Sequence, residues 1–197
     1  MEFLTFLGRT LGFSFAAGIN LYATVAVIGL ASRFGWVKLP PEYQVFDNDW
    51  IIGGALVLYV VEFFADKIPW VDTLWDGLHS LIRPLGGAAV AVAGLGEASP
   101  AMQIVIALLG GTVAAGSHAA KAGTRVAANS SPEPFSNWTL SIGEDVFVLT
   151  LAALAIQYPI AALTISVLLL VAIVLLVRAI VRAIRRRFWS PGEAPAG

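Results

Sequence analysis

Long apolar segments fill most of the chain, and short polar stretches separate them. A helix that crosses a bilayer needs about 20 mostly apolar residues. The pattern therefore predicts an all-α integral membrane protein with about six transmembrane helices. The expected segments are Phe3–Arg33, Trp50–Ala65, Leu74–Leu95, Pro100–Asn129, Gly143–Gln157 and Ala161–Ile184.

One stretch is too long to be a single crossing. No charged residue occurs from Val146 to Val177, and as one helix this stretch would measure about 48 Å against a hydrocarbon core of roughly 30 Å. Tyr158–Pro159 is the strong helix breaker within it. We therefore expect two helices joined by a tight turn at Pro159.

Composition agrees with a lipid-facing surface. The chain is 58% hydrophobic and 13% charged, whereas soluble domains carry about 25% charged residues. The absence of cysteine excludes disulfides and thiolate metal sites. A formal charge of −1 argues against a nucleic-acid partner, which leaves the lipid bilayer as the main expected surroundings.

The chain has an internal resemblance between its two halves. Leu11–Gly18 returns as Leu109–Gly116, 98 residues further on, and both copies end in Ala-Ala-Gly. The hydropathy pattern repeats with it, although Ala/Gly-rich sequences can also align by chance. We predict two three-helix repeats, residues 1–98 and 99–188, followed by a disordered cytoplasmic tail, 189–197. An odd number of crossings per repeat gives inverted topology, as in many secondary transporters.

The first segment of each repeat is too long for one straight crossing. A break at Gly18, and equally at Gly116, would give two half-helices that meet near the bilayer midplane. A re-entrant hairpin is the competing arrangement, and it would change the number of crossings. The arginine-rich stretch Arg178–Arg187 predicts a cytoplasmic C-terminus by the positive-inside rule.

Ionisable and polar groups interrupt the apolar segments in clusters. Such groups are costly in lipid and usually face a protein interior or a water-filled cavity. Asp72, Asp76, His79 and Arg83 follow one another at helical spacing and form one stripe. The full set of candidate substrate- or ion-binding residues is Asn20, Glu62, Asp66, Asp72, Asp76, His79, Arg83, His118, Lys121, Arg125, Glu144 and Asp145.

Structural explanations compete with a binding role for these residues. Asp76 could pair with His79, and Asp72 or Asp76 with Arg83, merely to lock two helices together. Lys121 and Arg125 could instead snorkel to the cytoplasmic face. The pair Glu144-Asp145 could be helix N-terminal charges that open the fifth span. Asn20 and His118 each follow an Ala-Ala-Gly break by two residues, where a half-helix N-terminus would favour an anion.

Two charged strings resemble the bacterial family called domain of unknown function 4126. They are Glu62-Phe63-Phe64-Ala65-Asp66-Lys67-Ile68-Pro69-Trp70-Val71-Asp72, continued by Trp75-Asp76-Gly77-Leu78-His79 and Ile82-Arg83-Pro84, and His118–Arg125, followed by Ser131–Pro134 and Ser141–Asp145. The resemblance covers roughly residues 15–147. It implies a bacterial inner-membrane location and no activity.

Three functions remain open on the sequence alone. The first is a small transporter or channel-like protein that moves an inorganic ion or small anion between the repeats, with a divalent cation at Asp72, Asp76 and His79 as an optional ligand. The second is a lipid-phosphate enzyme or flippase, although we expect no enzyme. The third is a non-catalytic assembly subunit. A homodimer through small-residue faces is a further expectation.

Overall fold

The computed structural model describes residues 1–36, 39–129 and 134–188. These residues form seven α-helices and one 3-10 helix and contain no strand, so the predicted all-α class is confirmed. The elements are α1 (Glu2–Ile19), α2 (Leu21–Arg33), η1 (Pro41–Phe46), α3 (Asp49–Ala65), α4 (Pro69–Ala93), α5 (Pro100–Asn129), α6 (Pro134–Gln157) and α7 (Pro159–Phe188).

Three of the described helices are long and apolar enough to cross a membrane. They are α5, the Phe135–Gln157 part of α6, and the Pro159–Arg187 part of α7. The turn between α6 and α7 falls at Tyr158–Pro159, as the length of the uncharged stretch predicts. The expectation of six crossings in two inverted repeats is finer than this finding and stays a prediction. The expected disordered tail lies outside the described residues.

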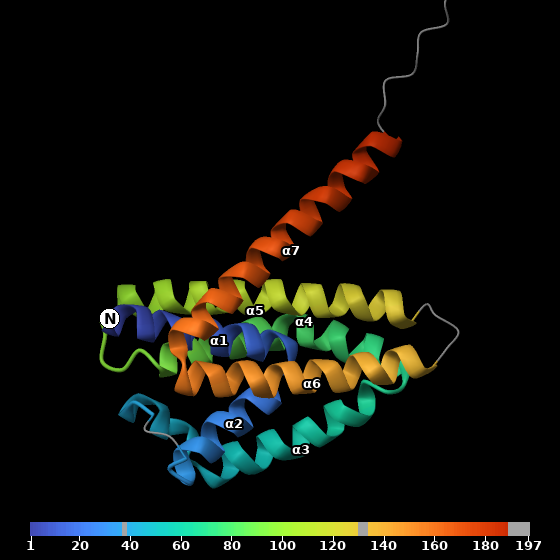
Figure 1. Ribbon diagram of the computed structural model, residues 1–197. Coiled ribbons are helices and arrows are strands. Elements are labelled where there is room, and N and C mark those ends of the chain that lie inside the picture. The colour runs from blue at the N-terminus through green and yellow to red at the C-terminus, as the bar shows by residue number, and fades with distance from the viewer. Residues whose placement is uncertain (37–38, 130–133, 189–197) are drawn as a thin grey trace, which may run out of the picture.

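Helices α4 and α5 run side by side, α1 packs between this pair and α6, and α2 and α3 lie on one side (Figure 1). Helix α7 leaves this bundle at an angle, and its residues 174–187 are exposed. The part of α7 before Arg178 is rich in Val, Leu and Ile, which is typical of a lipid-facing span.

The first predicted segment is a hairpin whose tip lies inside the bundle. Its break falls at Asn20, two residues beyond the predicted Gly18. Glu2 at the start of α1 and Leu95 after α4 line one pocket, and Arg33 at the end of α2 pairs with Asp47 before α3 and with Asp49, the first residue of α3. Both helices therefore return to the same end of the bundle (Figure 1). Of the two arrangements left open, the structure has a hairpin of two helices and not two half-helices in line.

The loop between α2 and α3 is held at this end by ion pairs and one buried ring. Arg33 Nε lies 2.8 Å from Asp47 and its Nη1 lies 2.7 Å from Asp49. The hydrogen bond to Asp47 raises the pKa of Arg33 above its ordinary value. Tyr43 packs edge-on against Phe13 of α1, and burial raises the pKa of its phenol. These contacts hold the loop between α2 and α3 against both helices of the hairpin.

The second predicted break is absent, so the prediction at Gly116 is wrong. Helix α5 continues unbroken from Pro100 to Asn129. After Ala-Ala-Gly, α5 continues with Ser-His-Ala-Ala-Lys-Ala, in which alanine and lysine are good helix formers. After the same motif, α1 meets Asn20, whose side chain caps the next helix instead.

Candidate functional site

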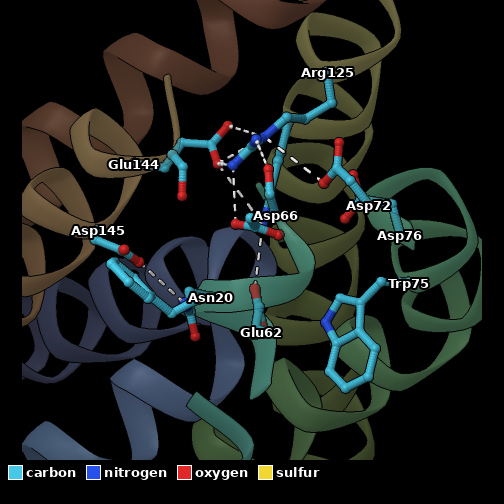
Figure 2. A network of polar contacts seen from close by, with 12 residues as sticks. Asn20, Glu62, Asp66, Asp72, Trp75, Asp76, Arg125, Glu144 and Asp145 are labelled. Carbon is cyan, nitrogen blue, oxygen red and sulfur yellow. Dashed lines mark hydrogen bonds and ion pairs between the residues drawn. The ribbon is translucent and has the colours of Figure 1, made fainter. Parts of the chain in front are cut away.

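The twelve residues singled out in the sequence all lie inside the bundle. Eleven are buried, and the Glu144 side chain is 12% exposed. Helices α3, α4, α5 and α6 supply ten of them, while Asn20 sits at the tip of the α1–α2 hairpin and Asp66 just after α3. Figure 2 shows many of these groups converging around Arg125.

Helix α4 has its polar face turned inward and its apolar face turned outward. Asp72, Asp76, His79 and Arg83 are buried. Leucines on the other face, at positions 74, 78, 81 and 85, are each more than 60% exposed. Water would favour the reverse orientation, so this helix suits lipid outside and a polar interior.

Arg83 joins three helices to the hairpin tip. Its Nη2 lies 2.7 Å from Glu62 Oε1 on α3, and its Nη1 lies 3.2 Å from Asp76 Oδ1 on α4. The same Nη1 donates to His118 Nδ1 on α5 at 2.8 Å and faces the Gly18 carbonyl at 3.5 Å. The predicted pairing of Asp76 with Arg83 is present.

Lys121 continues the network from α5. Its Nζ lies 3.2 Å from Glu62 Oε1, 3.4 Å from Asp66 Oδ2 and 3.7 Å from Glu144 Oε2. The side chain is 1% exposed. The snorkelling explanation for Lys121 is therefore wrong, because its charge points into the bundle.

Arg125 is the most fully bonded cation of the site. Its Nη2 lies 2.9 Å from Asp66 Oδ2 and 2.6 Å from Glu144 Oε2, and its Nε donates to the Glu144 carboxylate. Its Nη1 donates to the Asp66 carbonyl at 3.0 Å and to Asn137 Oδ1 at 2.8 Å. Asp72 Oδ1 lies at 4.0 Å from Nε. Snorkelling is also excluded for Arg125.

His118 is held as a neutral ring by its partners. Arg83 donates to Nδ1, so this nitrogen must accept. Ser80 Oγ donates to the Asp76 carbonyl, so it accepts from His118 Nε2 at 3.2 Å. A second proton on Nδ1 would face the guanidinium of Arg83. The position in mid-helix also removes the predicted half-helix N-terminus at His118.

His79 uses both ring nitrogens within the protein. Nδ1 lies 2.7 Å from the Trp75 carbonyl, which can only accept, and Nε2 lies 2.9 Å from the Tyr22 hydroxyl. The Trp75 ring stacks on the imidazole at 4.6 Å. The alternative pairing of Asp76 with His79 is thus replaced by contacts to Tyr22 and Trp75.

Asn20 and Asp145 form a pair at the hairpin tip. Asn20 Oδ1 accepts from the Ala23 amide and caps α2, while Nδ2 donates to Asp145 Oδ1 at 3.3 Å. A helix N-terminus favours a nearby anion, and here the protein's own Asp145 supplies it (Figure 2). The expected anion site at Asn20 is therefore filled from within.

Glu144 and Asp145 do not open a helix. Helix α6 begins at Pro134, so both residues lie about three turns into this helix and not at its N-terminus. The explanation of a helix N-terminal charge pair is wrong. Their burial is instead matched by Arg125 and Asn20.

Carboxylates outnumber cations in the connected ion-pair network. Five carboxylates, Glu62, Asp66, Asp72, Asp76 and Glu144, meet three cations, Arg83, Lys121 and Arg125. Several of their buried oxygens have no hydrogen-bond donor, namely Glu62 Oε2, Asp66 Oδ1, Asp72 Oδ1 and both oxygens of Asp76. The site is thus richer in negative charge than its own cations can balance.

Lys67, in the turn between α3 and α4, makes no ion pair with this network in the described contacts. Its Nζ donates to the Phe63 carbonyl and the Ser141 hydroxyl, and it lies 3.1 Å from the centre of the Phe63 ring. Burial lowers the pKa of Lys67.

Two pockets reach the network from different sides. A 140 Å³ pocket between α4 and α5 is lined by Asp76, Ser80, Arg125 and Asn129 among others. A larger pocket of 790 Å³ between α5, α6 and α7 has mostly apolar walls and reaches Lys121 and Glu144.

The proposed metal set of Asp72, Asp76 and His79 has no support in the geometry. No group of three His, Asp or Glu side chains among residues 1–36, 39–129 and 134–188 is arranged to hold a metal ion directly. Both nitrogens of His79 are already bonded, so His79 does not belong to such a set.

Four partners of the network were not singled out in the sequence. Asn137 bonds Arg125, Asn129 bonds Asp72, Tyr22 bonds His79, and Ser80 bonds His118. A signal exists for Asn137, because it precedes Ser141, Glu144 and Asp145 at helical spacing. Tyr22 and Asn129 carry no such signal, since their contacts depend on how separate helices pack.

The fold and site thus define a helical protein with lipid-compatible helices and a buried, carboxylate-rich centre. The chain belongs to the family described as domain of unknown function (DUF4126), whose model matches residues 7–179. The resemblance of its charged strings to this family is therefore confirmed. Searches of curated proteins and of solved structures gave no match.

Proposed function

We propose that this protein is a small membrane transporter or channel-like protein that moves a cation through its buried charge network. One observation carries the proposal: five carboxylates share three cations at the centre of helices whose outer faces are apolar. Uncompensated buried charge is expensive. A network with this imbalance favours the uptake of protons or of a cation.

The same geometry argues against an anion as the transported species. Arg83 and Lys121 each contact at least two carboxylates, and so does Arg125. An anion would have to displace these carboxylates from their cations. The helix N-terminus at Asn20 already faces Asp145.

The network offers a chain of charged groups between the two pockets. Asp76 lines the pocket between α4 and α5, and ion pairs lead through Arg83, Glu62 and Lys121 to Glu144. Glu144 lines the larger pocket between α5, α6 and α7. A cation passing from one pocket to the other would meet the carboxylates of Asp76, Glu62 and Glu144 in turn, with Arg83 and Lys121 paired between them.

In this proposal the pathway lies between the two halves of the chain. Residues 1–98 supply most of the carboxylates, and residues 99–188 supply Lys121, Arg125 and Glu144. We place the protein in the bacterial inner membrane with a cytoplasmic C-terminus, in keeping with the exposed arginines at the end of α7.

Flux into proteoliposomes tests this function. The purified chain is reconstituted into vesicles loaded in turn with dyes sensitive to protons, Na⁺, K⁺ and Mg²⁺, and a gradient of each cation is applied. At least one cation should move faster than in protein-free vesicles, and Asp76→Asn should reduce that rate at least tenfold. The proposal fails if none of the four moves above background.

Glu97→Gln is the matched control for Asp76→Asn. Glu97 is an exposed acidic residue in the loop between α4 and α5, away from the network. Its flux should equal that of the unchanged protein. If Asp76→Asn lowers the amount of folded protein without lowering flux per folded molecule, the network is structural, as the assembly-subunit hypothesis expects.

A lipid-handling role is the second candidate, and the 790 Å³ pocket favours it. Its walls include Phe15, Phe147, Leu169 and Ile173, and its polar end reaches Glu144. An opening between membrane helices suits an acyl chain. Scrambling of a headgroup-labelled phospholipid in the same vesicles would support this role, and the absence of scrambling beside measurable cation flux would exclude it.

A further inference from the structure

The smaller pocket, between α4 and α5, has the features of an ion site. It encloses 140 Å³ and is lined by Thr73, Asp76, Gly77, Ser80, Ala122, Arg125, Val126 and Asn129. Apart from the Arg125 guanidinium, its polar side chains present oxygen atoms or an amide. Oxygen ligands are the choice of hard cations.

Two carboxylates, Asp76 in the lining of this pocket and Asp72 one turn away, have oxygens that accept no hydrogen bond. Asp76 is 5% exposed and neither of its oxygens accepts a hydrogen bond, although Oδ1 lies 3.2 Å from Arg83 Nη1. Asp72 is fully buried one turn away, and its Oδ1 also has no donor. Figure 2 shows both carboxyl groups on the inner face of α4.

Asn129 completes the arrangement from α5. Its amide Nδ2 donates to Asp72 Oδ2 at 2.7 Å. Neither Asp72 Oδ1 nor Asn129 Oδ1 has a hydrogen-bond partner. The amide thereby fixes Asp72 and offers one more oxygen to the pocket. Buried oxygens of this kind normally have a partner.

We propose that this pocket binds a hard divalent cation of the magnesium class that keeps part of its water shell. Asp76 and Asn129 would face the ion, and Asp72 would add charge from behind. Mg²⁺ is commonly held by one or two carboxylates and retains several waters, and the pocket has room for an ion with a few water molecules. No cage of three acidic or histidine ligands is then required.

The charges that face this pocket favour a divalent ion. The nearest positive groups are Arg83, which pairs with Glu62 as well as with Asp76, and Arg125, which lines the pocket and pairs with Glu144. His118 on α5 is neutral in its hydrogen-bonding pattern, because its Nδ1 accepts from Arg83. The network has two more carboxylates than cations, so one divalent ion would balance it.

This inference names the ion of the proposed transporter and rests on that function for its role, but binding can be tested without transport. Mn²⁺ is a spectroscopic substitute for Mg²⁺. Free Mn²⁺ is titrated by electron paramagnetic resonance against the purified full-length protein in detergent, and Mg²⁺ is then added as competitor. We expect one bound Mn²⁺ that Mg²⁺ displaces.

Variants assign the binding to this pocket. Asp76→Asn should weaken Mn²⁺ binding at least tenfold, and Glu97→Gln should leave it unchanged. Should Asp76→Asn fail to fold, Asn129→Ala is the second variant, since it removes an oxygen at the helix end without changing charge, and it should weaken binding by a smaller factor. Equal binding in the unchanged protein and in both variants would overturn the proposal.

The two proposals fail differently. Mn²⁺ binding that Mg²⁺ displaces, without flux of any cation, would leave the ion site standing and remove the transport function. Proton flux without Mn²⁺ binding would leave transport standing and overturn the divalent site, because protons would then balance the excess carboxylates.

Discussion

At the scale of single residues, Arg125 holds the site together more than any other side chain. It bonds two carboxylates, a backbone carbonyl and Asn137, and so ties α5 to α6 and to the turn after α3. The side chain is 1% exposed. Its carboxylate partners, Asp66 and Glu144, would be left buried with reduced compensation if its charge were removed.

Replacing Arg125 by Gln should therefore destabilise the protein by about 3–5 kcal/mol, the usual cost of breaking a buried ion pair. Thermal unfolding in detergent, followed by tryptophan fluorescence, measures the change. Arg185→Gln is the matched control, because Arg185 is an exposed arginine near the end of α7. Its effect should be close to zero.

A double variant distinguishes the ion pair from simple loss of packing. Arg125→Gln combined with Glu144→Gln removes both charges of the 2.6 Å contact. The double variant should be less destabilised than the sum of the two single variants, because no carboxylate is left facing a missing cation. Strict additivity would mean that the contact contributes no coupling.

The hairpin tip gives a second test at this scale. Asn20 caps α2 and donates to Asp145. Asn20→Asp keeps the cap acceptor but sets two carboxylates against each other, so it should lower the unfolding temperature. The swapped variant Asn20→Asp/Asp145→Asn restores one amide and one carboxylate and should recover most of the loss. Failure of the swap to recover stability would contradict the pairing.

Sequence reasoning located these residues but, apart from the pairing of Asp76 with Arg83, not their partners. Charges inside apolar segments are rare, so the sequence alone identifies Arg83, Lys121 and Arg125 as candidate site residues. Which carboxylate each one meets depends on helix rotation and depth, and these are set by packing between helices. The pairing of Lys121 with Glu62, 59 residues away, has no local signal in the sequence.

At the scale of elements, the two Ala-Ala-Gly motifs have different structural roles. A Cβ atom on Gly18 would overlap Ala114 and Ser117 of α5, so this glycine allows α1 to touch α5. At Gly116 a Cβ would meet only Leu170 Cδ2, at 3.5 Å. The resemblance between the motifs predicted a shared break, and the structure instead places the break where Asn20 caps α2.

The two glycines give a matched pair of variants. Gly18→Ala should destabilise the protein by about 1–3 kcal/mol or more, because the added methyl overpacks the contact between α1 and α5. Gly116→Ala should be neutral or slightly stabilising, since alanine favours a continuous helix. Tryptophan-monitored thermal unfolding of both variants checks this. Equal destabilisation would mean that α5 also needs a glycine for close packing or a break.

At the scale of the whole molecule, the hairpin changes the expected topology. Helix α1 begins and helix α2 ends at the same end of the bundle, and the tip that joins them, at Asn20, lies inside the bundle (Figure 1). We predict that α3 to α7 then form five crossings instead of six, of which α5, α6 and α7 are the three long and apolar enough to be candidate spans among the described helices. An odd number places the two termini on opposite sides. A cytoplasmic C-terminus would put the N-terminus outside.

Single-cysteine labelling tests this topology directly, because the natural chain contains no cysteine. Glu2→Cys, Phe34→Cys and Trp70→Cys place a thiol at three exposed positions. Glu2 and Phe34 flank the hairpin, and Trp70 begins α4 at the opposite end of the bundle. In intact bacterial cells, a membrane-impermeant maleimide should label the first two thiols, and the third should react only after the membrane is permeabilised.

Labelling of Glu2→Cys and Phe34→Cys from opposite sides would mean that α1 and α2 together cross the bilayer, and the six-crossing topology would then replace the hairpin. Labelling of both from the inside would keep the hairpin and reverse the orientation of the whole protein, against the arginine-rich end of α7.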